Sequence, residues 1–114
     1  MLLALCVYML LTNQAAQGFK TITADVVFED GSQHHYVIKT KAETLREALE
    51  AHKLITGEES AYGLFITGVD GVEADESKQQ WWCILKNGEQ LNNGAETEMI
   101  ADGDSYTLEL RAGY

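Results

Sequence analysis

The sequence contains no proline, only two cysteines, and no charged residue before Lys20. Cys6 lies in an apolar N-terminal stretch, so Cys83 is the only thiol that remains if that stretch is removed. An intramolecular disulfide is then excluded, and the core must be stable without cross-links. A single cysteine inside an apolar strand is typical of a small buried hydrophobe, and we expect Cys83 to be one.

Basic residues are scarce as well. The chain has 8 lysines and arginines against 18 aspartates and glutamates, which gives a net charge of -10. An acidic surface repels nucleic acid and anionic lipid headgroups, and no basic stripe in the sequence offsets that repulsion. We therefore expect no nucleic-acid partner.

The N-terminal segment is apolar. Leu2 to Leu11 form an apolar run, shorter than the roughly 20 residues that a membrane-spanning helix needs. Such a run, followed by the small-x-small sequence Ala16-Gln17-Gly18, is typical of a secretory signal. We expect residues 1–18 to be a signal-peptide-like or anchor segment and residues 19–114 to be an exported domain, secreted or at the cell surface. A buried N-terminal helix is the alternative.

A secretory signal normally carries a basic residue ahead of its apolar run, and this chain has none there. We therefore expect the natural start codon to lie upstream of Met1. Any contact with a membrane is expected only through this N-terminal segment.

The first part of the domain alternates apolar and polar residues. Ile22, Ala24, Val26 and Phe28 fall at every second position, which predicts a strand with one buried face. Asp30-Gly31 follows and is a favoured two-residue hairpin sequence, because both residues tolerate positive φ. The return strand is expected over residues 34–39.

A helix is expected next. Thr40-Lys41-Ala42-Glu43 has the pattern of a capping box. Leu45, Ala48, Leu49 and His52 follow at helical spacing, which predicts a helix of about 12 residues that packs one stripe onto the sheet. Gly57 is the expected end of that helix.

The remainder of the chain reads as strands separated by tight turns. Strands are expected over residues 64–69 and 72–74 around Asp70-Gly71, over 80–85 and 89–91 around Asn87-Gly88, and over 105–110 after Asp102-Gly103. Two strands, one helix and then several strands predict an α+β fold of the β-grasp type, with a mixed sheet packed on one helix.

The order of these motifs resembles a known family. The segments Tyr62 to Ile66, the Gly71 turn, Trp81-Trp82, Asn87-Gly88 with Gly94, and Asp102 to Asp104 resemble the C-terminal β-domain of transcobalamin and intrinsic factor. The same pattern is typical of bacterial exported transcobalamin-like domains of unknown function. The resemblance covers nearly all of residues 20–110.

The resemblance implies a β-grasp domain that closes over a corrinoid, whose other face rests on a separate helical domain in the carriers. That helical domain is absent from this sequence, so half of the carrier's clamp is missing. Cobalamin or another corrinoid is therefore a ligand implied by the resemblance, and no bound cofactor is otherwise expected.

The adjacent tryptophans are the strongest candidates for ligand contact. Neighbouring residues on a strand point to opposite faces, and the strand phase groups Trp81 with Cys83 and Leu85. We expect Trp81 to be buried and Trp82 to be the more exposed platform for a planar ligand or a partner's side chains. The alternative is that both are covered within the monomer. The expected ligand-binding residues are Trp82, Trp81, Tyr62 and Asn87.

Metal ligation is a weaker expectation. His34 and His35 are neighbours on a strand and should diverge, so they make a poor clip. The acidic turns could offer oxygen ligands to calcium, although neither has the spacing of a helix-loop-helix calcium site. Solvated turn residues are the alternative. The weak candidates are Asp102, Asp104, Asp70 and Asp75, with Glu73 and Glu76 beside them.

The sequence has no nucleophile elbow, phosphate loop or zinc-protease motif, so we do not expect an enzyme. The favoured function is a noncatalytic exported binding module for a small molecule, corrinoid-like in the leading hypothesis, or for a companion protein that completes the site. The alternatives are a calcium- or zinc-binding surface domain and a structural or assembly module.

Overall fold

The computed structural model describes residues 18–91 and 93–114. The signal or anchor segment expected over residues 1–18 lies, apart from Gly18, outside the described residues. Within the described part of the chain, no helix has both the length and the apolar character needed to cross a bilayer.

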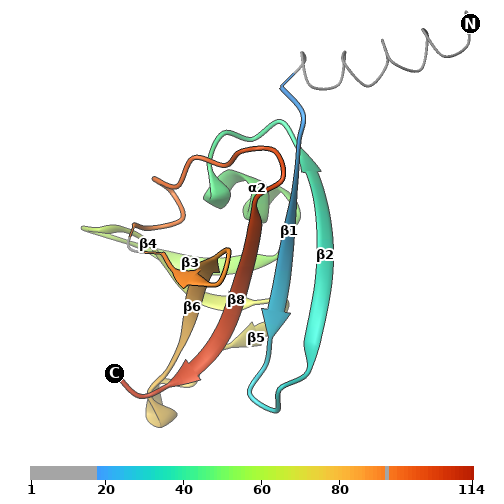
Figure 1. The fold of residues 1–114 in the computed structure, drawn as a ribbon. Coiled ribbons are helices and arrows are strands. Elements are labelled where there is room, and N and C mark those ends of the chain that lie inside the picture. The colour runs from blue at the N-terminus through green and yellow to red at the C-terminus, as the bar shows by residue number, and fades with distance from the viewer. Residues whose placement is uncertain (1–17, 92) are drawn as a thin grey trace, which may run out of the picture.

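The described chain forms two sheets, one α-helix and one short 3-10 helix (Figure 1). The larger sheet has five strands in the order β2-β1-β8-β6-β7, and the smaller has three in the order β3-β4-β5. Along the chain the elements are β1 Lys20–Val27, β2 Gln33–Thr40, α2 Leu45–Ala51, β3 Ile55–Ser60, β4 Gly63–Val69, β5 Val72–Glu73, η1 Glu76–Lys78, β6 Gln80–Lys86, β7 Glu89–Gln90 and β8 Ser105–Ala112.

The expected alternation in β1 is confirmed. Ile22, Ala24 and Val26 are fully buried, while the residues between them are only partly covered. β1 pairs antiparallel with β2 and parallel with β8, where Thr23 faces Ser105. The first and last strands of the domain therefore lie side by side in the middle of the larger sheet.

One face of the larger sheet carries the core. Its buried side chains pack against α2 and against the smaller sheet, which both lie behind the larger sheet in Figure 1. Leu45, Ala48 and Leu49 of α2 are fully buried in that layer. The fold is therefore α+β, as the sequence predicts.

Two of the expected two-residue turns are confirmed. Val69 pairs directly with Val72 across Asp70-Gly71, and both turn residues have positive φ, 52° and 80°. Asn87-Gly88 has the same geometry, with φ of 51° and 85°. A type I′ turn requires positive φ at both positions, which explains why these dipeptides join strands so tightly.

The turn between β1 and β2 is longer than expected. Val27 pairs with Gln33, so residues 28–32 form the loop and the two-residue prediction for Asp30-Gly31 is wrong. The Asp30 side chain accepts hydrogen bonds from both the backbone N–H and the hydroxyl of Ser32. This local bonding favours the wider loop, which begins at Phe28, whose N–H donates to the carbonyl oxygen of Ser32 at 2.9 Å.

The helix begins later and ends earlier than the sequence predicts. Its N-cap is Thr44, whose hydroxyl oxygen accepts from the N–H of Glu47 at 3.2 Å. Thr40 cannot cap the helix because it is the last residue of β2 and pairs with Lys20. The helix has 7 residues and ends at Ala51, so its expected length of about 12 was wrong.

A strand replaces the expected helix end at Gly57. β3 was not predicted, because its residues beyond Ile55 are all exposed and therefore show no apolar alternation. Gly57 lies at a register shift between β3 and β4, where an added Cβ would approach the carbonyl oxygen of Phe65 within 2.5 Å. Gly57 thus permits close strand contact instead of ending a helix.

We expect the Thr44 cap to contribute measurably to stability. Thr44→Ala removes the acceptor for Glu47 N–H and should lower the free energy of unfolding by about 1 kcal/mol. Thr44→Ser retains a hydroxyl and should stay close to wild type. Urea denaturation of both variants measures the difference, and an equal loss in the two would exclude a capping role.

Candidate functional site

A shallow apolar groove lies between β4 and β6. β7 pairs only with Leu85 and Lys86, at the end of β6. The earlier part of β6 pairs with β8 along one edge, and among the described residues no strand pairs with its other edge, which runs beside β4. The groove has a volume of about 180 Å³. Its walls are Leu64, Phe65 and Ile66 from β4, Trp81, Trp82 and Ile84 from β6, and Gly94 with Ala95 from the following loop.

The loop wall of this groove is held in place by the helix and by β4. The backbone N–H of Arg46 donates to the carbonyl oxygen of Ala95 at 2.9 Å. The backbone N–H of Leu64 donates to the Glu96 carboxylate, which also lies 3.5 Å from the Arg46 guanidinium. These contacts fix the loop wall of the groove against α2 and β4.

The two tryptophans point to opposite faces of β6, as expected, but their roles are reversed. Trp82 is buried, with 6% of its surface exposed, whereas Trp81 is half-buried. Across the sheet Trp82 faces Leu110 on the core side, and Trp81 faces Arg111 on the outer side. The prediction that Trp81 is buried and Trp82 exposed is wrong because α2 and the smaller sheet cover the opposite face.

Each indole N–H has a fixed partner. Trp82 Nε1 donates to the carbonyl oxygen of Val72 at 3.2 Å, and its ring meets Phe28 edge to face at 6.3 Å. Trp81 Nε1 donates to the carbonyl oxygen of Gly113 at 2.9 Å, and the Arg111 guanidinium lies over the Trp81 ring at 5.9 Å. Trp81 therefore offers a half-open aromatic surface at one side of the groove.

Cys83 is fully buried, as the sequence predicts. Burial raises the pKa of its thiol, which is then more strongly protonated at neutral pH. A thiol in this state is a packing group, not a nucleophile.

Phe65 is the groove residue that sequence reasoning missed. Its side chain is 55% exposed, next to the partly buried Leu64 and Ile66. The alternation around it was a usable signal, because a residue between two core-facing neighbours must face outward.

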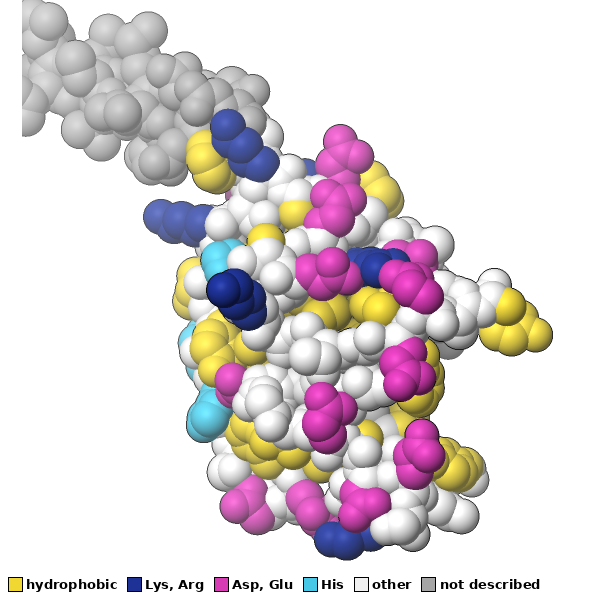
Figure 2. Space-filling model, turned by 180° about the vertical axis from the view of Figure 1, so that it is seen from behind, with side chains coloured by type: hydrophobic (Ala, Val, Ile, Leu, Met, Phe, Trp, Pro, Cys, Tyr) yellow, Lys and Arg dark blue, Asp and Glu magenta, His cyan; other side chains and the backbone are white. Residues whose placement is uncertain are grey.

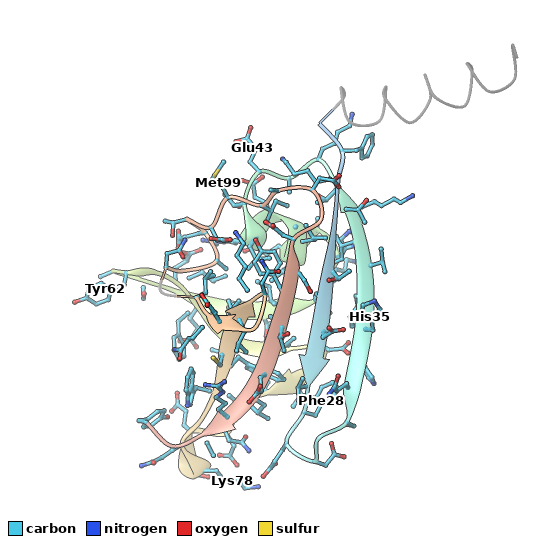
Figure 3. The ribbon with its side chains drawn as sticks, viewed as in Figure 1. Phe28, His35, Glu43, Tyr62, Lys78 and Met99 are labelled. Carbon is cyan, nitrogen blue, oxygen red and sulfur yellow. The ribbon has the colours of Figure 1, made fainter. Side chains whose placement is uncertain are left out.

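Tyr62 and Asn87 do not join the tryptophans. Tyr62 is fully exposed at the tip of the hairpin between β3 and β4, away from the body of the domain (Figure 3). Asn87 lies in the turn between β6 and β7 and lines a different hollow of about 470 Å³. Of the four predicted ligand-binding residues, the structure brings together Trp81 and Trp82.

The acidic turn residues are occupied by local bonds. Asp102 accepts from the N–H of Thr21 at 2.7 Å, and Asp104 accepts from the N–H of Ala101 at 2.9 Å. Asp75 caps η1 by accepting from Ser77. Among residues 18–91 and 93–114, no three histidine, cysteine or acidic side chains converge as a metal site would require.

The two histidines diverge, as expected for neighbours on a strand. His34 Nδ1 lies 2.6 Å from Asp70, which also accepts from the Tyr36 hydroxyl at 2.7 Å. His35 Nδ1 is paired instead with Asp25 of β1. Asp70 therefore binds side chains of β2, whereas Asp75 caps η1, and the two candidate acids do not act together.

A buried polar cluster closes the other end of β6 and β8. Glu98 accepts from the hydroxyl of Tyr106 at 2.8 Å and pairs with the Lys86 ammonium at 2.8 Å. Burial raises the pKa of the Glu98 carboxyl, but the hydrogen bonds from Lys86 and Tyr106 outweigh that effect and lower it overall. Glu98 is thus ionised in a site where it is 8% exposed.

Acidic side chains are scattered over the face seen in Figure 2, with few lysines and arginines between them.

Comparison with known proteins places the chain in a family. Residues 42–112 match the family described as a domain of unknown function, DUF4430, and the chain belongs to it. Human Transcobalamin-1 is 27% identical over 99 residues, which are 87% of this chain but only 22% of Transcobalamin-1. The chain is therefore a transcobalamin-like domain of unknown function that spans less than a quarter of that relative.

Two solved structures share the fold. A suspected metal-binding protein from Ruminococcus gnavus ATCC 29149 is 47% identical with a TM-score of 0.81, covering 83% of this chain and 99% of that protein. Haptocorrin in complex with Cbi has a TM-score of 0.74 at 19% identity, covering 86% of this chain and 26% of haptocorrin. The first supports the family assignment, and the second shows the fold alone.

We expect the two tryptophans to differ strongly in their effect on stability. Trp82→Ala leaves a cavity in the core and should lower the free energy of unfolding by about 3–5 kcal/mol. Trp81→Ala removes a half-exposed ring and should cost about 1 kcal/mol. Denaturant unfolding of the two variants gives the comparison, and similar losses would contradict the assignment of faces.

Glu98 should make stability depend on pH. Because its folded pKa lies below the ordinary 4.5, its contribution is present above that value and is lost as pH falls through the folded pKa. At about pH 7, Glu98→Gln should be less stable than wild type, and the gap should narrow towards about pH 3 as wild type becomes protonated. Urea midpoints across this range test the prediction, which a constant gap would refute.

Proposed function

We propose that this chain is a noncatalytic, exported binding module with a β-grasp-like fold, and that its β4–β6 groove receives one side of a corrinoid-like small molecule. The proposal is supported most directly by the half-open Trp81 ring and the exposed Phe65 ring on the same apolar groove. The fold that this chain shares with haptocorrin in complex with Cbi supports the ligand class. The parallel β1–β8 pair at the centre of a sheet packed on one helix supports the β-grasp assignment.

The size of the groove supports a site shared with a second domain or protein. Its volume of about 180 Å³ lies below the ~300–1,000 Å³ of a pocket that encloses a small-molecule ligand. A corrinoid could therefore rest on this surface but not be enclosed by it. A companion domain or protein would supply the second wall, in line with the 22% of Transcobalamin-1 that this chain spans.

In this arrangement the residues have different roles. Trp81 and Phe65 would stack on the ligand, while the buried Trp82 would support the floor. Tyr62, which is fully exposed at its hairpin tip, would reach the companion rather than the groove. Asn87 would contact only a ligand that extends beyond the β6–β7 turn.

Isothermal titration with cobinamide and cobalamin tests the proposal. Because one wall is missing, we expect weak binding by the isolated chain, with a dissociation constant of about 0.1–1 mM. Trp81→Ala and Phe65→Ala should each weaken it at least about tenfold, which corresponds to about 1.4 kcal/mol. Val37→Ala is the matched control, since Val37 is an exposed apolar residue of β2 outside the groove.

Absence of heat, together with an unchanged melting temperature at about 1 mM ligand, would remove the corrinoid proposal. Binding that survives both groove substitutions would move the site elsewhere.

A metal-binding surface domain is the second candidate. It is favoured by the 47% identical structure of a suspected metal-binding protein. The acids at issue are Asp70, Asp75, Asp102 and Asp104, and further ligands would have to come from outside the described residues, which gather no three-ligand group. Calcium or zinc that raises the melting temperature would favour this function over the first.

Dimerisation that rises with protein concentration and needs no ligand would point instead to an assembly module.

A further inference from the structure

The strand β2 has an open edge along its whole length. It lies at the end of the larger sheet, and among the described residues it pairs only with β1 (Figure 1). The pairs from Lys20 with Thr40 to Val27 with Gln33 follow one another without a register shift. The other edges are short, irregular or covered: β5 and β7 have two residues each, β3 shifts register against β4, and β6 runs beside β4. Of the described strands, β2 alone therefore combines length and regular pairing with an open edge.

This edge presents the backbone groups of every second residue of β2. The N–H of Thr23 donates to the carbonyl oxygen of Asp104 at 3.0 Å, and the carbonyl oxygen of Thr21 accepts from the N–H of Gly103 at 2.8 Å. The odd-numbered residues of β1 therefore face β8, and the even-numbered ones bond with their partners in β2, which are also even-numbered. The backbone N–H and C=O groups that point away from β1 belong to Gln33, His35, Val37 and Lys39.

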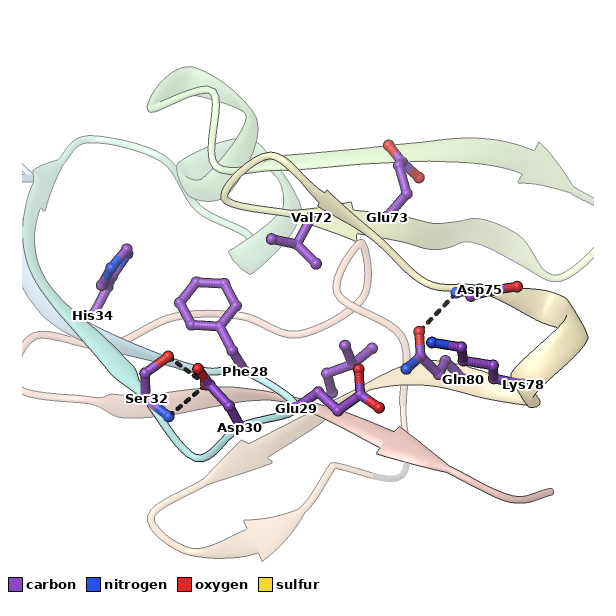
Figure 4. A pocket seen from close by; sticks show the side chains of 11 residues that line it. Phe28, Glu29, Asp30, Ser32, His34, Val72, Glu73, Asp75, Lys78 and Gln80 are labelled. Atoms are coloured by element: carbon purple, nitrogen blue, oxygen red, sulfur yellow. Dashed lines mark hydrogen bonds between the residues drawn. The ribbon is translucent and has the colours of Figure 1, made fainter.

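The side chains of these same residues form an exposed row on the outer face of the sheet. Val37 is 60% exposed and stands between His35 and Lys39, which are also exposed. The alternate residues of β2 face the core side, where His34 meets the Phe28 ring edge to face at 4.9 Å (Figure 4). A strand added at this edge would thus meet an apolar side chain at its centre and a cation beside it.

β2 is held in place by the rest of the fold. At its start, the N–H and the hydroxyl of Ser32 donate to the Asp30 carboxylate, as the dashed lines in Figure 4 show. On the outer face, His35 pairs with Asp25 of β1, and every residue of β2 has a partner in β1. Because the strand is already ordered, a segment that pairs with it does not bear the entropic cost of ordering β2.

The charge of this segment is opposite to that of the protein. Residues 31–42 contain two lysines, two histidines and no aspartate or glutamate, in a chain whose net charge is -10. Lys39 and Lys41 are exposed, and among the described residues neither forms an ion pair. Lys41 lies over the Phe19 ring at 4.8 Å. A carboxylate brought opposite Lys39 would therefore meet a cation that no acid of the described residues neutralises.

We propose that the β2 edge binds an extended, acidic segment of a partner protein, which joins the larger sheet as an additional strand. An apolar residue of the segment would pack on Val37, and a carboxylate two positions away would face Lys39. Charge complementarity selects this occupant over a second copy of the chain, because no residue of β2 carries a carboxylate that could face Lys39 of another copy. This edge is separate from the β4–β6 groove, and the proposal does not depend on the corrinoid proposal.

Two end-blocked peptides of opposite charge test the proposal on the full chain. Glu-Thr-Glu-Thr-Val-Thr-Glu-Thr-Glu reads the same in both directions, so it can place its valine on Val37 and a glutamate beside Lys39 in either strand direction. The second peptide has lysine in place of every glutamate. Cross-strand charge pairs favour the acidic peptide, whereas general attraction to a chain of net charge -10 favours the basic one. Titration followed by two-dimensional amide NMR should show the acidic peptide binding at least about fivefold more tightly, and the reverse order would refute the proposal.

Amide hydrogen exchange reports whether the peptide adds as a strand. The N–H groups of Val37 and Lys39 point to the open edge, so the acidic peptide should slow their exchange. The N–H groups of Tyr36 and Ile38 already bond to β1, and their exchange should change little. Slowed exchange in another segment instead would overturn the proposal. Protection of the edge amides that rises with protein concentration and needs no peptide would also overturn it, because a second copy would then occupy the edge.

Charge reversal at the edge should reverse the preference. Lys39→Glu should bind the basic peptide at least about fivefold more tightly than the acidic one. Lys78→Glu makes the same change in net charge in η1, at the other end of the molecule from the C-terminal end of β2 (Figure 3), and should keep the wild-type preference. The same preference in both variants would refute a site at Lys39.

A backbone variant isolates the strand pairing. Val37→Pro removes an N–H that points to the open edge and leaves the bonds to β1 in place, so it should weaken the acidic peptide at least about tenfold. Val37→Thr keeps the N–H and should bind within about twofold of wild type. Equal binding by a folded proline variant would exclude strand addition, and the Lys39 comparison decides the proposal if that variant does not fold.

Discussion

The parallel pairing of β1 with β8 is the constraint on which the rest of the fold depends. It joins residues 23–27 to residues 105–109, so the larger sheet is complete only when the two ends of the domain are paired. The turn before β8 reinforces the junction, because Asp102 accepts from the N–H of Thr21 and the N–H of Gly103 donates to the carbonyl oxygen of Thr21. Tyr106, the largest of the fully buried side chains, anchors this strand in the core.

Trp82 connects that core to the β4–β6 groove and to β5. Its ring helps to line the β4–β6 groove, and its indole N–H donates to the carbonyl oxygen of Val72 in β5. Phe28 contacts the same ring edge to face. A single buried side chain therefore supports the apolar wall of the groove and the position of β5.

Local sequence patterns predicted much of this fold where a side chain fixes its own backbone. The alternation in β1 and the type I′ turns at Asp70 and Asn87 were predictable because strand phase and positive φ are local properties. The N-cap of the helix was not predictable in this way, because both Thr40 and Thr44 precede a glutamate by three residues. Only the pairing of Thr40 with Lys20 in the sheet excludes Thr40 as the cap. The polar strand β3 was not predicted, because it is a strand through its backbone pairing with β4 and not through an apolar pattern of its own.

The sequence by itself determined that strand, strand, helix and strands follow one another, that Cys83 is a packing residue, and that the two indoles point to opposite faces. Only the tertiary structure decided which face α2 and the smaller sheet cover, and hence that Trp82 is buried and Trp81 half-open. Alternation fixes a relative orientation, but burial depends on the layer that packs against it. For the same reason, the convergence of Phe65 with Trp81 could not be read from residues so distant in the chain.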